Sequence, residues 1–277
     1  RATPRGWATG HDLLSEAVDA ALPTAEAARL HRALAATIED PPERAAHLAG
    51  AGDPDAAAAA YAAAARALLE ARSAGDAATL ATRGLALASR GADRAELHDA
   101  RAMARSLTGN LPGARDDLRT ALRLRTPGPD RARLMARLAM SYSGADDPER
   151  AHELSELALV EAGDDPAARA VALEVASILD VNRGDDDRAR SRSEEARSLY
   201  AELGDAVGTA RILDARAMAT FLSGDIRTAE RLFDHVAGVF EDCGDLFREL
   251  TPRSTQGHAL VFLGRPADGL AAATSSL

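Results

Sequence analysis

The chain has 277 residues, a formal net charge of −10 and only 3% aromatic residues. It contains no lysine, since all 33 basic residues are arginine, and this excludes P-loop nucleotide binding and Schiff-base catalysis, which both require lysine. The acidic balance argues against direct nucleic-acid binding, and no segment approaches the ~20 consecutive apolar residues that cross a membrane.

Residues 10–52 are expected to form three short helices that share no repeat. Their apolar residues lie in segments 11–18, 28–35 and 45–53. The segments are separated by Pro23-Thr24 and by Pro41-Pro42, where proline ends one helix or begins the next. This stretch differs from everything that follows it.

From residue 53 onward a turn signature recurs. It reads Ser73-Ala74-Gly75-Asp76, Thr108-Gly109-Asn110, Asn182-Arg183-Gly184-Asp185, Ser223-Gly224-Asp225 and Leu263-Gly264-Arg265. Small residues recur at intervals of 37 to 40 along the same stretch, namely Ala114, Ala151, Ala189, Ala229 and Gly269. Such a period, with no alternating β-branched runs, predicts repeated helical hairpins.

Each part of the signature has a physical role in a hairpin. Glycine ends the first helix in a left-handed conformation, and the following Asp or Asn caps the second helix. The acidic runs at 146–147, 164–165 and 185–187 are therefore expected to cap helices, since each stands where a helix begins. The alanine-rich run 56–67 is expected to be the first helix of the first hairpin, because Tyr61 and Leu68 give it an apolar face.

The units resemble tetratricopeptide (TPR) repeats of the longer, MalT-like variety. The best match is Leu138-Ala139 with Tyr142, Ala151 and Ala158, which stand where that family places its Leu, small, aromatic and alanine residues. Elsewhere Asp180 and Thr220 occupy aromatic positions. The resemblance covers residues 53–277, about five full units and one truncated unit, and implies an all-α superhelical solenoid of TPR-like hairpins.

The N-terminal stretch resembles the junction between the ATPase and the repeats in large ATP-binding regulators of the signal-transduction ATPase class, including LuxR-family transcriptional regulators. The segments that carry this resemblance are 11–18, 29–35, His47 and Ala51-Gly52-Asp53. It implies that residues 1–52 form a short helical adaptor that ends a module following an upstream ATPase. Any DNA-binding domain would follow Leu277.

Catalytic and metal-binding motifs are absent from the sequence. No two of the seven histidines stand at the i, i+4 spacing of a helical zinc site, and Cys243 is the single cysteine. One cysteine cannot form an intrachain disulfide, which fits the cytoplasm. We expect no catalytic residue, no metal site, no cofactor and no enzymatic activity, while an enzyme whose site escapes motif analysis remains the alternative.

Partner binding is expected on the concave face of the solenoid, which the first helix of each hairpin lines. The candidates are polar residues on those helices: Arg101, Arg105, Arg137, Ser141, Asp180, Asn182, Arg216, Thr220 and His258.

Two functional hypotheses follow. The first is a non-catalytic sensor segment of an ATP-dependent transcriptional regulator, which binds a protein, a peptide or a small-molecule effector and biases the ATPase. The second is a TPR scaffold or adaptor that binds a protein or peptide partner. Neither involves direct contact of this segment with nucleic acid or membrane.

Overall fold

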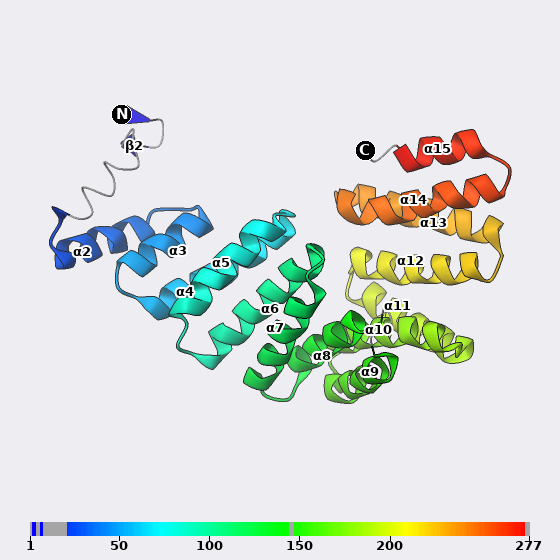
Figure 1. The fold of residues 1–277 in the computed structure, drawn as a ribbon, viewed down its shortest axis with the longest axis horizontal. Helices are drawn as coiled ribbons and strands as arrows, with labels where there is room; N and C mark the ends of the chain where they lie inside the picture. The colour runs from blue at the N-terminus through cyan, green and yellow to red at the C-terminus, as the bar shows by residue number, and fades with distance from the viewer. Residues whose placement is uncertain (1, 4–5, 8–20, 144–146, 275–277) are drawn as a thin grey trace. The chain divides into compact units, whose positions relative to one another are not determined.

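The computed structural model describes residues 2–3, 6–7, 21–143 and 147–274. The chain divides into two compact units, residues 1–125 and 126–277, here called the N-terminal and C-terminal units. Figure 1 labels their helices. The first predicted helix, residues 11–18, lies outside the described residues, as does part of the acidic run at 146–147.

The described residues of the N-terminal unit form helices, apart from two short strands of two residues each at its start. The strands β1 (Ala2–Thr3) and β2 (Gly6–Trp7) are antiparallel, with Ala2 opposite Trp7. The helices are α2 (Thr24–Ala35), α3 (Pro41–Gly50), α4 (Pro54–Glu70), α5 (Ala74–Leu87), α6 (Gly91–Leu107) and α7 (Leu111–Leu124). Helices α4 and α5 form one hairpin and α6 and α7 the next, with α4 also packed against α6.

The C-terminal unit continues the hairpin pattern. Its helices are α8 (Pro129–Ser141), α9 (Pro148–Ala162), α10 (Pro166–Arg183), α11 (Asp186–Glu202), α12 (Ala206–Leu222), α13 (Ile226–Asp242), α14 (Leu246–Phe262) and α15 (Pro266–Thr274). Consecutive helices pack against one another throughout this unit, and α12 to α15 run side by side in Figure 1. The all-α prediction of TPR-like helical hairpins is confirmed.

The turns have the chemistry that the sequence predicts. Gly184 and Gly224 adopt φ values of 76° and 91°, in the left-handed region where a side chain is disfavoured. The next residues, Asp185 and Asp225, accept hydrogen bonds from the backbone N–H groups of Arg188 and Thr228. The predicted pairing of a helix-ending glycine with a helix-capping acid is therefore correct at these turns.

The first predicted turn is wrong in its position. Gly75 lies inside the first turn of α5, and the left-handed residue between α4 and α5 is Arg72, with a φ of 65°. Ser73 directly precedes α5, and its hydroxyl donates a hydrogen bond to the side chain of Asp76 at 2.6 Å. The turn is therefore made by a left-handed arginine and not by the glycine that the sequence indicates.

The cores of the two units use different side chains. The core of the N-terminal unit is mostly alanine, including the fully buried Ala57, Ala64 and Ala65 of α4. The C-terminal unit also buries Phe233 and Phe240 of α13 almost completely. Small residues allow the helices to approach closely, which fits the low aromatic content.

Helices α2 and α3 precede the first full hairpin. They pack against each other, and their histidines His31 and His47 lie with their Nδ1 atoms 2.8 Å apart. Helix α3 packs against α4, and the turn at Gly52 connects the two helices. Asp53 caps α4 by accepting a hydrogen bond from the N–H of Ala56. The domain boundary after residue 52 remains a prediction.

Candidate functional site

A cavity of about 730 Å³ opens in the C-terminal unit, mainly between helices α10, α11 and α12. Its size is typical of small-molecule and peptide side-chain sites. The lining residues of α10 recur at intervals of three and four, which places them on one face of that helix. They include Ser177, Ile178, Val181 and Asn182, and the lining on α12 includes Arg211, Asp214, Ala215, Met218, Ala219 and Leu222.

One wall of the cavity is fixed by a cluster of three polar side chains from three helices. Arg211 of α12 donates to both carboxylate oxygens of Glu174 of α10, each at 2.9 Å. The hydroxyl of Tyr200 on α11 donates to the same carboxylate at 2.5 Å and accepts from Arg211 at 3.1 Å. Burial and the Glu174 carboxylate raise the pKa of Tyr200, so its hydroxyl stays protonated. The cluster joins α10, α11 and α12 rigidly.

Asp214 lies on the same face of α12, one turn after Arg211. It lines the cavity, and its Oδ1 atom is buried without a hydrogen-bond partner. Burial raises the pKa of the Asp214 carboxyl to about 6, because the charged form loses hydration that nothing replaces. The neighbouring guanidinium does not compensate, since Arg211 is committed to Glu174.

Three of the predicted groove residues line this cavity. They are Asn182, Arg216 and Thr220. Thr220 donates its hydroxyl to the carbonyl of Arg216, and Arg216 itself pairs with Glu194 at 3.5 Å. Asp180 points elsewhere: its side chain is 1% exposed and forms an ion pair with Arg192 of α11 at 2.8 Å.

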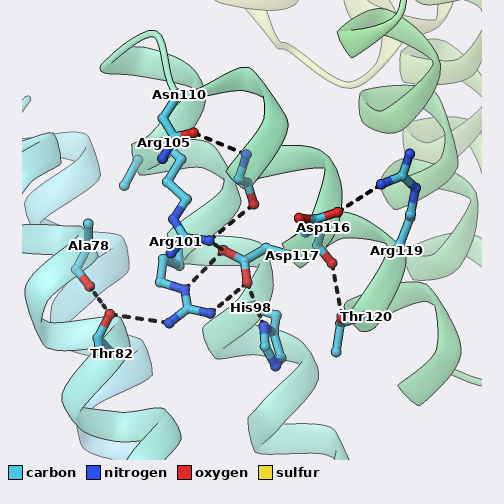
Figure 2. Close-up of polar contacts among 12 residues, drawn as sticks. Ala78, Thr82, His98, Arg101, Arg105, Asn110, Asp116, Asp117, Arg119 and Thr120 are labelled. Atoms are coloured by element: carbon cyan, nitrogen blue, oxygen red, sulfur yellow. Dashed lines mark hydrogen bonds and ion pairs between the residues drawn. The ribbon is translucent and has the colours of Figure 1, made fainter.

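Two further predicted residues, Arg101 and Arg105, belong to a cluster in the N-terminal unit (Figure 2). Both donate from α6 to the carboxylate of Asp117 on α7, at 2.7 to 2.9 Å. His98 of α6 contacts the same carboxylate through Nδ1 at 2.8 Å. We call these four residues the Asp117 cluster.

The Asp117 cluster connects α6 to α7, and its Arg101 also donates to the hydroxyl of Thr82 on α5 at 3.3 Å (Figure 2). Burial alone would raise the pKa of the Asp117 carboxyl, but the hydrogen bonds from His98 and Arg101 and the nearby guanidinium charges outweigh it and lower the pKa. Arg105 also donates to the backbone carbonyl of Gly113. These arginines therefore connect α6 to α7.

The remaining predicted residues lie apart from the cavity. Ser141, at the end of α8, donates its hydroxyl to the carbonyl of Leu138 at 2.6 Å. Arg137 is half-buried on α8, and His258 is exposed on α14. The structure does not bring these three residues together with the cavity residues.

Sequence reasoning missed the cavity residues Asp214 and Ile178. One signal was present, because Asp214 is a lone acid within the mainly apolar stretch of α12 from Ile212 to Met218. An acid at that phase of the helix faces its neighbours rather than open solvent.

A group of potential metal ligands lies between α9 and α10. His152, Glu156 and Asp180 have ligand atoms within 4.8 Å of one another. The guanidinium of Arg192 already bridges the two carboxylates, at 2.8 Å from each. Arg188 also pairs with Glu156 at 3.0 Å, so two guanidinium groups contact the two acids and the group does not suit a metal ion.

None of the helices in the described part of the chain is long and apolar enough to cross a bilayer. No family model matches the sequence, and no curated protein matches it.

Solved structures with the same fold are TPR-like repeat proteins. A tetratricopeptide repeat protein from Parabacteroides merdae has a TM-score of 0.61 at 13% identity, with 91% of each chain covered. A Rap protein in complex with the competence and sporulation factor has a TM-score of 0.63 at 15% identity, covering 72% of this chain. BtubC from P. vanneervenii has a TM-score of 0.52 at 17% identity, covering 74% of this chain and 87% of BtubC.

The chain spans 57% of the length of that Rap protein. Likeness at such low identity establishes a shared fold and not a shared activity. The chain is thus a TPR-like helical repeat.

Proposed function

We propose that this chain is a non-catalytic binding module that holds a peptide or an extended segment of a partner protein in the α10–α12 cavity. The observation that carries the proposal is the cavity itself, which combines apolar side chains with a few fixed polar groups. Proteins built from stacked helical hairpins generally bind their partners on extended concave surfaces. The similar Rap protein was solved with the competence and sporulation factor bound, so the fold holds a partner in that case.

Two features of the cavity favour binding over catalysis. Arg211 is held in place by two hydrogen bonds to Glu174 and one to Tyr200. The lining offers no cysteine or histidine as a nucleophile or general base. The side chains that line it are therefore suited to shape and charge recognition.

A phage-displayed random peptide library tests this function. The wild-type chain is compared with Ala219→Trp, which places an indole in the cavity, and with Ala201→Trp, which places the same group on an exposed position of α11 outside the lining. We expect wild type and Ala201→Trp to enrich the same peptides and Ala219→Trp to lose them, with circular dichroism showing all three folded. Equal enrichment by all three proteins, or none by wild type, contradicts the proposal.

A second candidate is the sensor segment of an ATP-dependent transcriptional regulator. It is supported by the adaptor resemblance, since His31 and His47 of the matching segments contact each other and Asp53 caps α4. The sequence of the gene that encodes this chain tests it. A nucleotide-binding ATPase upstream of Arg1 is expected, and a frame that lacks one overturns this candidate while leaving the binding module intact.

A further inference from the structure

Asp214 stands out among the acids that line the cavity. The residue is only partly exposed, and its Oδ1 atom has neither solvent contact nor a hydrogen-bond partner. A carboxylate oxygen in this position loses hydration without gaining a compensating bond. The fold thus keeps an unfavourable group at a binding surface.

The arrangement of α12 shows why the protein itself does not satisfy this group. Arg211 lies three residues before Asp214, a spacing at which an ion pair could form. Its guanidinium instead makes two hydrogen bonds to Glu174 and one to Tyr200. Since these bonds occupy Arg211, Asp214 has no cation from its own helix.

The other charged groups of the cavity do not supply a cation for Asp214 either. Besides Asp214, the charged residues in its lining are Glu174, Asp186, Arg190, Arg211, Arg216 and Arg248. Each arginine has a carboxylate within 4 Å, supplied by Asp187, Glu174, Glu194 and Asp245 respectively. Asp186 is exposed in the first turn of α11, where the helix dipole favours negative charge. The missing complement is therefore a cation beside Asp214.

We propose that Asp214 recognises a cationic nitrogen, an ammonium or a guanidinium, on the peptide that occupies the α10–α12 cavity. This inference rests on the proposed function of the same cavity. Ile178, Val181 and Met218 line the cavity with Asp214, so the ligand presents apolar groups next to the cation. The bound cation pairs with the carboxylate where Asp214 lines the cavity.

The peptide selections test this specificity with two further variants. Asp214→Asn removes the charge and keeps the shape, and Asp186→Asn removes an exposed acid from the same lining. We expect wild type and Asp186→Asn to enrich peptides that carry a cation. Asp214→Asn should enrich peptides with no preference for a cation. Enrichment of acidic peptides by wild type, through the arginines, overturns the inference.

Synthetic peptides from the selection identify the source of the cation. Acetylating the N-terminus removes the terminal ammonium, and replacing lysine or arginine by glutamine removes the side-chain cation. For wild type, removing the recognised cation should weaken binding by roughly tenfold or more in fluorescence anisotropy, whereas Asp214→Asn should lose little. If neither change weakens binding to wild type, the inference is wrong although the cavity still binds peptides.

A pH series gives an independent readout. Lowering the pH from about 8 to about 5 protonates Asp214, so wild-type affinity for the cationic peptide should fall by roughly tenfold. Asp214→Asn should show no such fall. An identical pH dependence in both proteins contradicts the role of Asp214. If the peptides bind Ala219→Trp, whose cavity is filled, as well as they bind wild type, the proposed function itself is contradicted.

Discussion

Asp117 in the N-terminal unit and Asp214 in the C-terminal unit are the same residue type in opposite situations. Asp117 is 2% exposed and receives hydrogen bonds from two arginines, with His98 also in contact. Asp214 lines a cavity, and its Oδ1 atom has no partner. The pKa of the first carboxyl is lowered and that of the second is raised to about 6.

The difference lies in which partners the neighbouring helix supplies. Arg101 and Arg105 stand one turn apart on α6 and converge on the single carboxylate of Asp117 (Figure 2). On α12, Arg211 and Arg216 lie on either side of Asp214 in the sequence, but they pair with Glu174 and Glu194 respectively. A buried acid with internal partners stabilises its hairpin, whereas one without them is available to a ligand.

The largest expected effect comes from breaking the Asp117 cluster. Asp117→Ala leaves Arg101 and Arg105 partly buried without their shared carboxylate, and should lower the free energy of unfolding by about 2–4 kcal/mol. Denaturant unfolding followed by circular dichroism measures this. Asp116→Ala is the matched control, because that neighbour is 75% exposed and should change stability by no more than about 0.5 kcal/mol.

The same variant has a predictable pH dependence. Because the folded-state pKa of Asp117 is lowered, its contribution to stability is present above the unfolded-state value of about 3.9 and is lost as the pH falls through the folded-state value. The difference between wild type and Asp117→Ala should therefore shrink below about pH 4. A difference that grows in acid would show that Asp117 is not ionised in the cluster.

Removing the charge of Asp214 should have a smaller effect of opposite sign. Its folded-state pKa is raised to about 6, so its favourable contribution is complete below about pH 3.9 and is lost as the pH rises through about 6. At neutral pH Asp214→Asn should raise the free energy of unfolding by about 1–2 kcal/mol, after allowance for partial solvent screening. Denaturant unfolding at about pH 7.5 and about pH 4 measures this, with a gain expected only at the higher pH. Destabilisation at the higher pH would mean that Asp214 has an internal partner.

Much of the fold could be predicted because the repeat signal lies in short, local chemistry. Gly184-Asp185 and Gly224-Asp225 fix a helix end and a helix start within two residues each. The prediction was wrong at Gly75, which lies inside α5, while Arg72 adopts the left-handed conformation. A Gly-Asp pair in the sequence therefore does not by itself fix where a turn lies.

The candidate site was less predictable, because it depends on helix phase and on which ion pairs form. Asp180 and Asn182 are two residues apart on α10, yet Asn182 lines the cavity while Asp180 is buried against Arg192. Arg101 was expected in the groove, but its long side chain extends to Asp117 on the next helix. Sequence identifies the charged residues, whereas their partners follow from packing between hairpins.

The smallest effect tests whether Asp214 can be converted to the paired state of Asp117. Met218 lies four residues after Asp214 and also lines the cavity, so Met218→Arg places a guanidinium at i, i+4 spacing, a pair worth about 0.5 kcal/mol on a helix. The pKa of Asp214, followed by NMR titration of its carboxyl, should fall from about 6 by roughly 0.4 of a unit, since one pKa unit corresponds to about 1.4 kcal/mol. Met218→Gln, of similar length but uncharged, should leave that pKa unchanged.

Met218→Arg also connects the pairing of Asp214 to binding. A cation supplied by the protein should compete with one supplied by a ligand. Met218→Arg should therefore weaken the binding of cationic peptides more than Met218→Gln does. If the pKa of Asp214 is the same in folded Met218→Arg and Met218→Gln proteins, the carboxylate cannot be reached from the cavity side of α12. In that case a ligand could not reach it either, and Asp214 would be only an unpaired buried acid.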